Sequence, residues 1–310
     1  MKHNVLKGLN FTGLPFKSTF EPLHIIDNVK YDATHNKKDL WILLQDMSKA
    51  YDHVNIFMLI KALERLHIPF NFLRFILKMF GNRHNQIFTL FGNTDSYKVI
   101  SGIDQGEIIS PLLWCIYYDP LLCRIQNSAY GYSLTHSWKP NILYDEMETM
   151  TIKTSALAYM DDTLWIAKFR DDLNNIINIA ESFYRLNHIK VNWDKSVLLI
   201  NNSRQNQPLI CDINGNLTKI DPLSLNDSTR YLGLWISLGR NKTFTIKLLQ
   251  NEIKNAVNIM FKKWLTDKQL VYIFNTVLTP RLEYRAQTIA LSERQCDAIC
   301  SPYQAFMKKS

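Results

Sequence analysis

Residues 156–167 read Ala156-Leu157-Ala158-Tyr159-Met160-Asp161-Asp162-Thr163-Leu164-Trp165-Ile166-Ala167. Two adjacent carboxylates separate two short β-prone runs, so we predict a hairpin with both acids at its tip. The flanking runs are apolar enough to be buried, and like charges beside a core are unfavourable without a positive group between them. A divalent cation is a natural partner, because hard cations take carboxylate oxygens. The alternative is an exposed acidic turn, which is the commoner explanation for such a pair on its own.

Asp46 is the second carboxylate of interest. Residues 40–45 are apolar except for the last, a Gln, and this pattern predicts a buried strand. Asp46 follows the stretch, so we expect its carboxylate to emerge at the edge of a sheet. A strand-ending Asp that caps the next turn is the simpler explanation. Asp46 taken together with Asp161 and Asp162 favours a catalytic role, because acids at the ends of strands from distant parts of the chain can meet in one sheet. Two metals about 4 Å apart, held by such acids, clamp the attacking and leaving oxygens of a phosphoryl transfer.

A glycine-containing loop, residues 101–111, ends in Ser110-Pro111, which predicts a helix with Ser110 as N-cap and Pro111 at its first position. Gly102 and Gly106 allow close backbone approach, so the loop could lie against a nucleotide or a template base. By itself the pattern is weak, since glycine loops before helices are usually turns.

The remaining chain is mixed α and β up to about residue 238 and helical afterwards. We expect a hairpin from strands 85–91 and 96–101, and we expect residues 131–153 and the stretch between residues 200 and 231 to be irregular. Apolar spacing predicts helices over 54–67, 69–80, 171–187 and 244–262, and a further helix that begins near the capping box Thr266–Gln269 and stops at Pro280.

Charge follows the same division. The 310 residues carry a formal net charge of +8, of which residues 1–238 contribute +1 and residues 239–310 contribute +7. A basic segment suggests a polyanion such as nucleic acid as a partner, although a solvated basic helix surface is equally consistent.

Five Cys without C-x-x-C spacing argue against a disulfide framework and a zinc site. No signal peptide or membrane segment is apparent, so we expect an intracellular protein, nuclear or cytoplasmic, with no membrane partner.

In this order, the motifs resemble those of reverse transcriptases, most closely the non-LTR (LINE-type) retrotransposon enzymes. The resemblance spans about residues 13–290. Tyr159–Asp162 matches the Y-x-D-D box, Asp46–Asp52 matches D-x-S-K-A-F-D, and Asp104–Leu113 matches P-Q-G-x-x-x-S-P-x-L. Asn192–Lys195 matches N-x-x-K, Tyr231–Gly233 matches Y-L-G, and Gly13–Thr19 matches the end of G-F-x-x-G-R-S-T.

The resemblance implies an α+β right-hand polymerase fold. Residues 1–238 would form partial fingers (1–39 and 54–100) and the palm, and residues 239–310 would form an all-helical thumb. The implied activity is RNA-directed DNA polymerisation, in which dNTPs are added to a primer 3′-hydroxyl by two-metal phosphoryl transfer. The implied partners are an RNA template, a DNA primer and dNTPs, and the implied cofactors are two Mg²⁺ ions, with Mn²⁺ as a possible substitute.

The resemblance also implies individual roles. Asp46 and Asp161 would bind the metals, with Asp162 in support, and Lys195 is a candidate to protonate the pyrophosphate. Tyr51 would exclude a ribose 2′-hydroxyl. Contacts with the nucleotide are implied for Gln105, Gly106 and Lys17. Contacts with the primer and the duplex backbone are implied for Tyr231, Gly233, Lys262 and Lys263.

Several positions depart from the family pattern. Asp104 replaces a Pro before Gln105, which we expect to loosen the turn and to add negative charge near the nucleotide. Lys17 replaces an Arg and loses bidentate phosphate geometry. The chain starts close to the end of the fingers element, so the alternative is a truncated, inactive retrotransposon remnant that at most binds nucleic acid. An RNA-dependent RNA polymerase is disfavoured, because Tyr51 stands where those enzymes carry an acid.

Overall fold

The computed structural model describes residues 5–139, 147–202, 207–213, 216–239 and 242–308. The chain divides into two compact units, Met1–Pro222 and Leu223–Ser310. The hairpin at residues 229–236 belongs to the second unit and contacts the later helix at residues 279–286. The palm up to residue 238 and the thumb after it stay a prediction.

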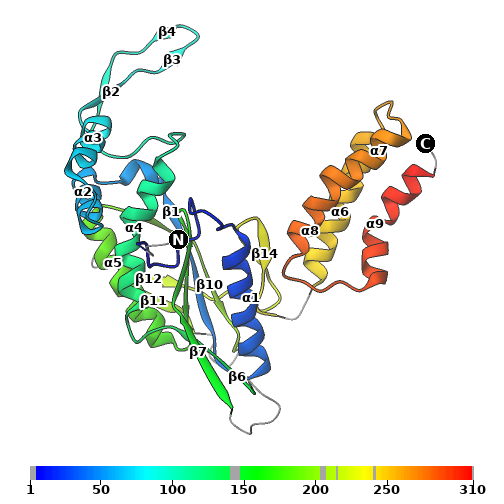
Figure 1. Ribbon diagram of the computed structural model, residues 1–310. Coiled ribbons are helices and arrows are strands. Elements are labelled where there is room, and N and C mark those ends of the chain that lie inside the picture. The colour runs from blue at the N-terminus through cyan, green and yellow to red at the C-terminus, as the bar shows by residue number, and fades with distance from the viewer. Residues whose placement is uncertain (1–4, 140–146, 203–206, 214–215, 240–241, 309–310) are drawn as a thin grey trace. The chain divides into compact units, whose positions relative to one another are not determined.

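A four-stranded antiparallel sheet forms the centre of the first unit, in the order β10-β1-β9-β8 (Figure 1). These strands are β1 (Trp41–Ser48), β8 (Ala156–Tyr159), β9 (Asp162–Ala167) and β10 (Lys190–Ile200). The first five residues of β1 are all buried, as expected for a strand covered on both faces. The stretch predicted as a buried strand is therefore the central strand of the sheet.

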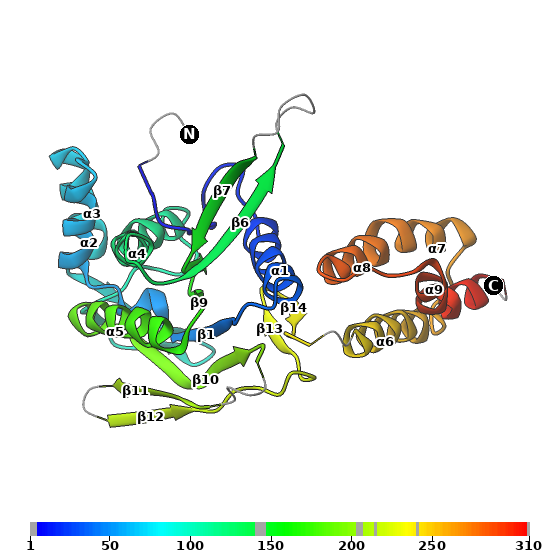
Figure 2. The same ribbon diagram turned by 90° about the horizontal axis from the view of Figure 1, so that it is seen from below.

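Helices cover both faces of this sheet. On one side α5 (Arg170–Asn187) contacts β1 and β9, and α4 (Ser110–Gln126) contacts β8 and packs on α2 (Ile56–Arg65). On the other side lies α1 (Phe20–His35), as Figure 2 shows from below. The capping pattern Ser18-x-x-Glu21 precedes α1, and Ser18 hydrogen-bonds Glu21 through its amide and hydroxyl, each at 2.8 Å. The sequence patterns did not predict this helix.

The segment before α1 completes the edge of the sheet. Asn10 forms a parallel bridge with Ala158, the Phe11 amide donates to the Ala158 carbonyl (3.0 Å) and the Ala158 amide donates to the Leu9 carbonyl (2.9 Å). Its continuation reaches the end of β8, where the Met160 amide donates to Thr12 Oγ1 (2.7 Å). Residues 9–12 therefore pair with the edge of β8 that faces away from β9.

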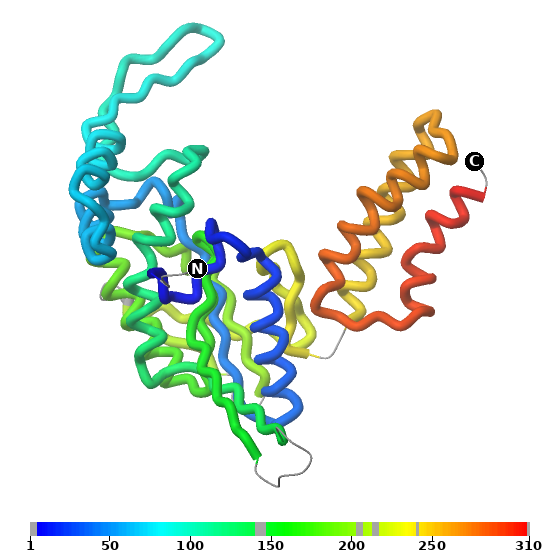
Figure 3. Tube along the Cα trace, viewed as in Figure 1, coloured from blue at the N-terminus to red at the C-terminus, as the bar shows by residue number. Residues whose placement is uncertain are grey.

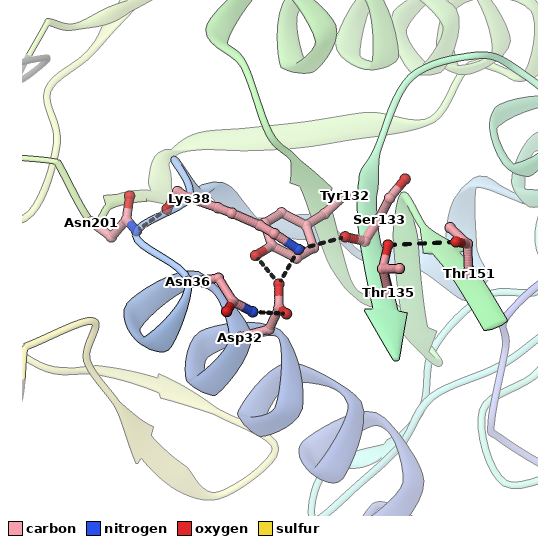
Figure 4. Close-up of polar contacts among 8 residues, drawn as sticks. All are labelled: Asp32, Asn36, Lys38, Tyr132, Ser133, Thr135, Thr151 and Asn201. Atoms are coloured by element: carbon pink, nitrogen blue, oxygen red, sulfur yellow. Dashed lines mark hydrogen bonds and ion pairs between the residues drawn. The ribbon is translucent and has the colours of Figure 1, made fainter. Parts of the chain in front are cut away.

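A buried polar cluster fastens the end of α1 to β6 (Tyr132–Trp138) (Figure 4). Asp32 accepts hydrogen bonds from the Tyr132 hydroxyl (2.5 Å), Lys38 Nζ (2.9 Å) and Asn36 Nδ2 (2.7 Å). Burial alone would raise the pKa of Asp32, but these three donors hold it below its ordinary value. Strand β6 pairs with β7 (Glu148–Thr154), so the irregular structure predicted for residues 131–153 is wrong for the two strands, whose regular pairing extends to Trp138 and Glu148. Residues 140–146 of the predicted stretch lie outside the described residues.

Two further hairpins belong to the first unit. After α3 (Phe70–Phe80), strands β2 (Arg83–Asn85) and β5 (Tyr97–Val99) pair, and β3 (Phe88–Thr89) and β4 (Gly92–Asn93) continue the same arm, which extends beyond α3 in Figure 3. A hairpin was predicted here, but with its turn at residues 92–95; that placement is wrong, because Gly92 belongs to β4 and pairs with Thr89, which puts the turn at residues 90–91. Strands β11 (Leu209–Ile213) and β12 (Asn216–Ile220) pair where we predicted only a loop.

The second unit is a hairpin followed by helices. Strands β13 (Thr229–Tyr231) and β14 (Leu234–Ile236) precede α6 (Thr243–Met260), α7 (Asp267–Ile273), the π-helical η3 (Phe274–Leu278), α8 (Thr279–Ala286) and α9 (Glu293–Met307). The prediction that Pro280 stops a helix is wrong, because Pro280 lies in the first turn of α8, where no intrahelical N–H is needed. Leu249, Ile253, Leu270, Ile299 and Tyr303 form the core of the helices. Within the described ranges, no helix is long and apolar enough to cross a bilayer.

Candidate active site

The turn between β8 and β9 carries the first predicted acid. Tyr159 pairs with Asp162, so the two turn residues are Met160 and Asp161, and Asp162 already belongs to β9. The hairpin is confirmed, but the prediction that both acids form its tip is wrong. Met160 is fixed in the turn with a φ of 58°, and its carbonyl accepts a hydrogen bond from Trp114 Nε1 (2.9 Å).

The second predicted acid, Asp46, lies within β1 rather than at its end, because the strand continues to Ser48. It pairs with Asn192 of β10, and the register shifts between Leu44 and Asp46, which marks a bulge. Its side chain is 40% exposed and its Oδ2 lies 3.8 Å from Lys195 Nζ. The structure therefore brings the predicted residues Asp46 and Lys195 together.

Asp46 acts electrostatically on Asp161. Burial, and secondarily the negative charge of Asp46, raises the pKa of Asp161 above its ordinary value. Asp162 is exposed at the start of β9. In the part of the chain that the structure describes, no group of three or more His, Cys, Asp or Glu side chains could by itself hold a metal ion. Mg²⁺ is commonly held by one or two carboxylates plus substrate phosphates, so Asp161, which lines a cavity and feels the charge of Asp46, fits that cation.

A cavity of about 560 Å³ lies beside Asp161. It is formed by the β8–β9 turn, the short helical segment after β1 and the loop before α4. The lining residues are Tyr51, Gln105, Gly106, Glu107, Ile108, Ser110, Pro111, Met160 and Asp161. Three residues with predicted nucleotide contacts, Tyr51, Gln105 and Gly106, thus share one cavity with a predicted metal ligand.

Tyr51 is held in place within this cavity. It lies in the short 3₁₀ helix η1 (Ala50–His53), which begins after Lys49 in the left-handed conformation (φ 47°). Its hydroxyl donates to Met160 Sδ (3.0 Å), and its ring centroid lies 6.0 Å from that of Trp114. Burial, then the neighbouring Cys115 and Asp161, raises the pKa of Tyr51 to about 12, so the hydroxyl keeps its proton at neutral pH.

The loop before α4 is shaped by its glycines. Gly102 has a φ of +94°, and a Cβ there would lie 2.9 Å from Asp52 Cα, so only glycine permits this approach. Gly106 (φ +102°) has open space around it on the cavity side. Ser110 is the first residue of α4 and not its N-cap, because its hydroxyl donates instead to the Asp104 carbonyl (2.7 Å).

A buried chain of hydrogen bonds lies between the strands that carry the acids. Tyr184 and Trp165 both donate to Gln45 Oε1, at 2.7 and 2.9 Å. Tyr118 hydrogen-bonds Tyr184 (2.8 Å) and Thr163 (3.2 Å). Gln45 precedes Asp46 and Thr163 follows Asp162, so this network fixes both backbones next to the acids. Sequence reasoning missed it; the only available signal was a polar Gln inside an apolar strand.

The remaining predicted residues lie elsewhere. Lys17 Nζ lies 5.6 Å from the ring centroid of Phe11 and is not part of the cavity wall. In the second unit, Tyr231 is 3% exposed at the end of β13, and Gly233 (φ +82°) forms the β13–β14 turn, where the Tyr284 hydroxyl donates to the Leu232 carbonyl (2.6 Å). Lys262 and Lys263 are exposed in the turn after α6.

Comparison with known proteins matches these features to a family. A family model described as "Reverse transcriptase (RNA-dependent DNA polymerase)" matches residues 6–236. The chain is 25% identical over 262 residues to the retrovirus-related Pol polyprotein from the type-1 retrotransposable element R2 of Popillia japonica, covering 82% of this chain and 40% of that protein. It is 20% identical over 292 residues to the corresponding R2 polyprotein of Bradysia coprophila, covering 93% and 31%. The chain thus spans less than half the length of these relatives.

A solved structure supports the fold. Apo telomerase from Candida tropicalis matches with a TM-score of 0.50 at 14% identity, covering 97% of this chain and 47% of that one. The α+β polymerase fold predicted from the motifs is therefore confirmed, as is the resemblance to the enzymes of non-LTR retrotransposons.

Proposed function

The chain belongs to the reverse transcriptase family, and on that basis we propose that it is an RNA-directed DNA polymerase that extends a DNA primer along an RNA template. One observation carries the proposal. Asp161, which interacts electrostatically with Asp46, borders the same cavity as Tyr51, Gln105 and Gly106. Acids, an aromatic wall and a glycine loop are what a nucleotide-adding site requires in one place.

In the proposed reaction the primer 3′-hydroxyl attacks the α-phosphate of a dNTP, and pyrophosphate leaves. Asp46 and Asp161, assisted by Asp162, would hold two Mg²⁺ ions. When bound, such ions lower the pKa of the attacking hydroxyl and neutralise charge on the phosphates. The raised pKa of Asp161, caused by burial and by the nearby negative charge of Asp46, supports this assignment, because a bound cation relieves that situation.

Lys195 is suited to hold a proton near the leaving group. Its side chain is 70% exposed and its ammonium lies 3.8 Å from Asp46, so it can turn toward an incoming phosphate without leaving a buried charge behind. We assign it the protonation of pyrophosphate. Lys17 is assigned to the dNTP phosphates, reached by rotation away from the Phe11 ring.

The Tyr51 ring favours deoxyribonucleotides. It borders the cavity and is restrained by Met160 and Trp114, so its position is defined before a nucleotide enters. A bulky ring fixed in this way would clash with a 2′-hydroxyl. Gln105 and Gly106, from the opposite wall, would contact the templating pair.

The second unit would hold the primer and the duplex. The Tyr231 ring is buried, so we assign primer contact to the half-buried turn that contains Gly233. Lys262 and Lys263 project into solvent between the exposed side chains Phe261 and Trp264, where they could meet backbone phosphates.

A primer-extension assay tests the proposal. The full chain is incubated with an RNA template, an annealed DNA primer, dNTPs and Mg²⁺, with and without EDTA. Extension that requires both dNTPs and Mg²⁺ supports the polymerase. Binding of the primer–template without extension under these conditions would favour the alternative of an inactive remnant that retains only nucleic-acid binding.

A further inference from the structure

Arg83 lies at the base of the β2–β5 arm, just after the end of α3. Its guanidinium forms an ion pair with the Asp104 carboxylate through Nη1 and donates to the Gly102 carbonyl through Nη2 (2.7 Å). Nε donates to the Phe80 carbonyl (3.2 Å), and Cζ lies 5.3 Å from the Phe80 ring centroid. The Arg83 side chain is only 12% exposed, whereas its partner Asp104 is 46% exposed, so the pair is buried on the arginine side only.

The contacts of Arg83 converge on the loop that forms one wall of the nucleotide cavity. Gly102 and Asp104 lie directly before Gln105 and Gly106, which line that cavity. Asp104 itself is not a lining residue, and its carboxylate faces Arg83. We expected Asp104 to loosen this turn and to add negative charge near the nucleotide; the structure pairs that charge with Arg83, which also bonds the Gly102 carbonyl in the same turn.

The opposite side of the same loop is bonded to the segment that carries Tyr51. The Ile103 amide donates to the Tyr51 carbonyl (2.9 Å), and the Gly102 amide donates to the Val54 carbonyl (2.8 Å). The Ser101 hydroxyl donates to the Asp52 carbonyl (3.1 Å). A continuous path of direct contacts thus runs from Arg83 through Gly102 and Ile103 to the backbone of Tyr51.

We propose that Arg83 is a positioning residue for the nucleotide cavity. It clamps loop 101–106 between the base of the arm and the Tyr51 segment, and so sets the distance between the Tyr51 ring and the wall formed by Gln105 and Gly106. The planar guanidinium is required, because it reaches a carboxylate and two carbonyls at once, whereas the single ammonium of a Lys cannot. The inference rests on the proposed function for its kinetic consequence, but the clamp itself can be measured without catalysis.

The test compares the full-length wild-type chain with Arg83→Lys and Arg83→Ala, and uses Lys61→Ala as a matched control. Lys61 also forms an ion pair, at 2.8 Å from Glu64, but both side chains are exposed on α2. Hydrogen–deuterium exchange follows the amides of Gly102 and Ile103 in the metal-free protein. Steady-state kinetics then gives KM and kcat for dNTPs and for ribonucleotides.

Both Arg83 variants are expected to speed exchange of the two amides by about tenfold or more, the effect of losing about 1.4 kcal/mol of local stability. KM for dNTPs should rise by about tenfold and discrimination against ribonucleotides should fall, with kcat changed less than about threefold, because the loop positions the nucleotide and takes no part in the chemistry. Lys61→Ala should change none of these.

Three results would separate a failure of the clamp, of the positioning role and of the proposed function. Unchanged amide exchange in both Arg83 variants overturns the clamp. Faster exchange with unchanged KM and discrimination overturns the positioning role, because the contacts would then be structural only. If the wild-type chain extends no primer, the proposed function has failed, and the clamp is decided by the exchange measurement alone.

Discussion

The Tyr51 hydroxyl lies 3.0 Å from the Met160 sulfur, so the aromatic wall of the cavity is tied to the turn that carries Asp161. The two residues are separated by 109 positions in the chain. Sugar discrimination and metal binding would therefore depend on one local geometry, because a shift of the β8–β9 turn moves both the acid and the restraint on the ring.

Removing the Tyr51 ring should admit ribonucleotides. We expect Tyr51→Ala to reduce dNTP-over-rNTP discrimination by about 10–100-fold, the range for the loss of a few kcal/mol of selective contact. Tyr51→Phe keeps the ring and loses only the bond to Met160, so it should retain most of the discrimination. Competition assays with paired dNTP and rNTP substrates measure both variants. Equal discrimination in Tyr51→Ala and the wild type would rule out the steric role.

Neutralising Asp161 should abolish polymerisation and stabilise the metal-free protein. We expect Asp161→Asn to lower kcat by about 100-fold or more, as for other lost electrostatic groups at reacting phosphates. The same change removes a partly buried charge that Asp46 repels, so the thermal midpoint in EDTA should rise. Asp221→Asn, which alters an exposed ion pair with Lys219, serves as the control. Full activity in Asp161→Asn would contradict the assignment of this residue as a metal ligand.

Asp32 should contribute to the acid sensitivity of the fold. Its pKa is lowered because the donors Tyr132, Lys38 and Asn36 outweigh burial. Its stabilisation is therefore present above the unfolded aspartate pKa, about 3.9, and is lost as the pH falls through the lower folded value. Asp32→Asn should cost about 1–3 kcal/mol at pH 7 and flatten the decline in stability on acidification. Urea denaturation at pH 7 and at about pH 3 measures this, and Asp95→Asn on the exposed arm is the control.

The Gln45 network should be essential to stability. We expect Gln45→Ala to destabilise the protein by about 2–4 kcal/mol, because it creates a cavity and leaves the Tyr184 and Trp165 donors without their acceptor. Tyr184→Phe should cost about 1–2 kcal/mol, whereas Tyr272→Phe, at an exposed position, should be close to neutral. Chemical denaturation gives the three values. A neutral Gln45→Ala would mean that the network does not hold the strands.

The lysines after α6 should bind phosphates without sequence preference. Replacing both Lys262 and Lys263 by Ala should weaken binding of the primer–template. The slope of log affinity against log salt should become shallower by about 0.9 for each phosphate that the variant no longer neutralises on a B-form duplex. Fluorescence anisotropy over a salt series measures the slope. An unchanged slope would exclude both lysines from the interface.

Local patterns named residues that the structure brings to one cavity, whereas several elements around them were not predicted. Asp46, Asp161, Tyr51, Gln105 and Gly106 could be named because the chemistry requires particular residue types in a fixed order. The turn register could not be predicted, since it depends on Trp114 and Thr12, which bond Met160 from distant parts of the chain.

The same limit explains the missed elements. A proline ends a helix only where its missing N–H would have made an intrahelical hydrogen bond. Pro280 lies instead in the first turn of α8, and that position depends on the preceding π-helical turn. The pairing of β6 with β7 was hidden by polar residues, because both strands are largely exposed and carry no buried stripe. Arg83 carried no motif, and its importance comes from contacts across about 20 residues of intervening arm.

The pairing of residues 9–12 with β8 has a practical consequence for protein production. A purification tag attached close to Met1, or a shortened N-terminus beginning after Thr12, would disturb or remove the strand-like cover of β8 and the hydroxyl that bonds the Met160 amide. An uncovered strand edge invites association between copies, so aggregation and loss of activity would then arise together.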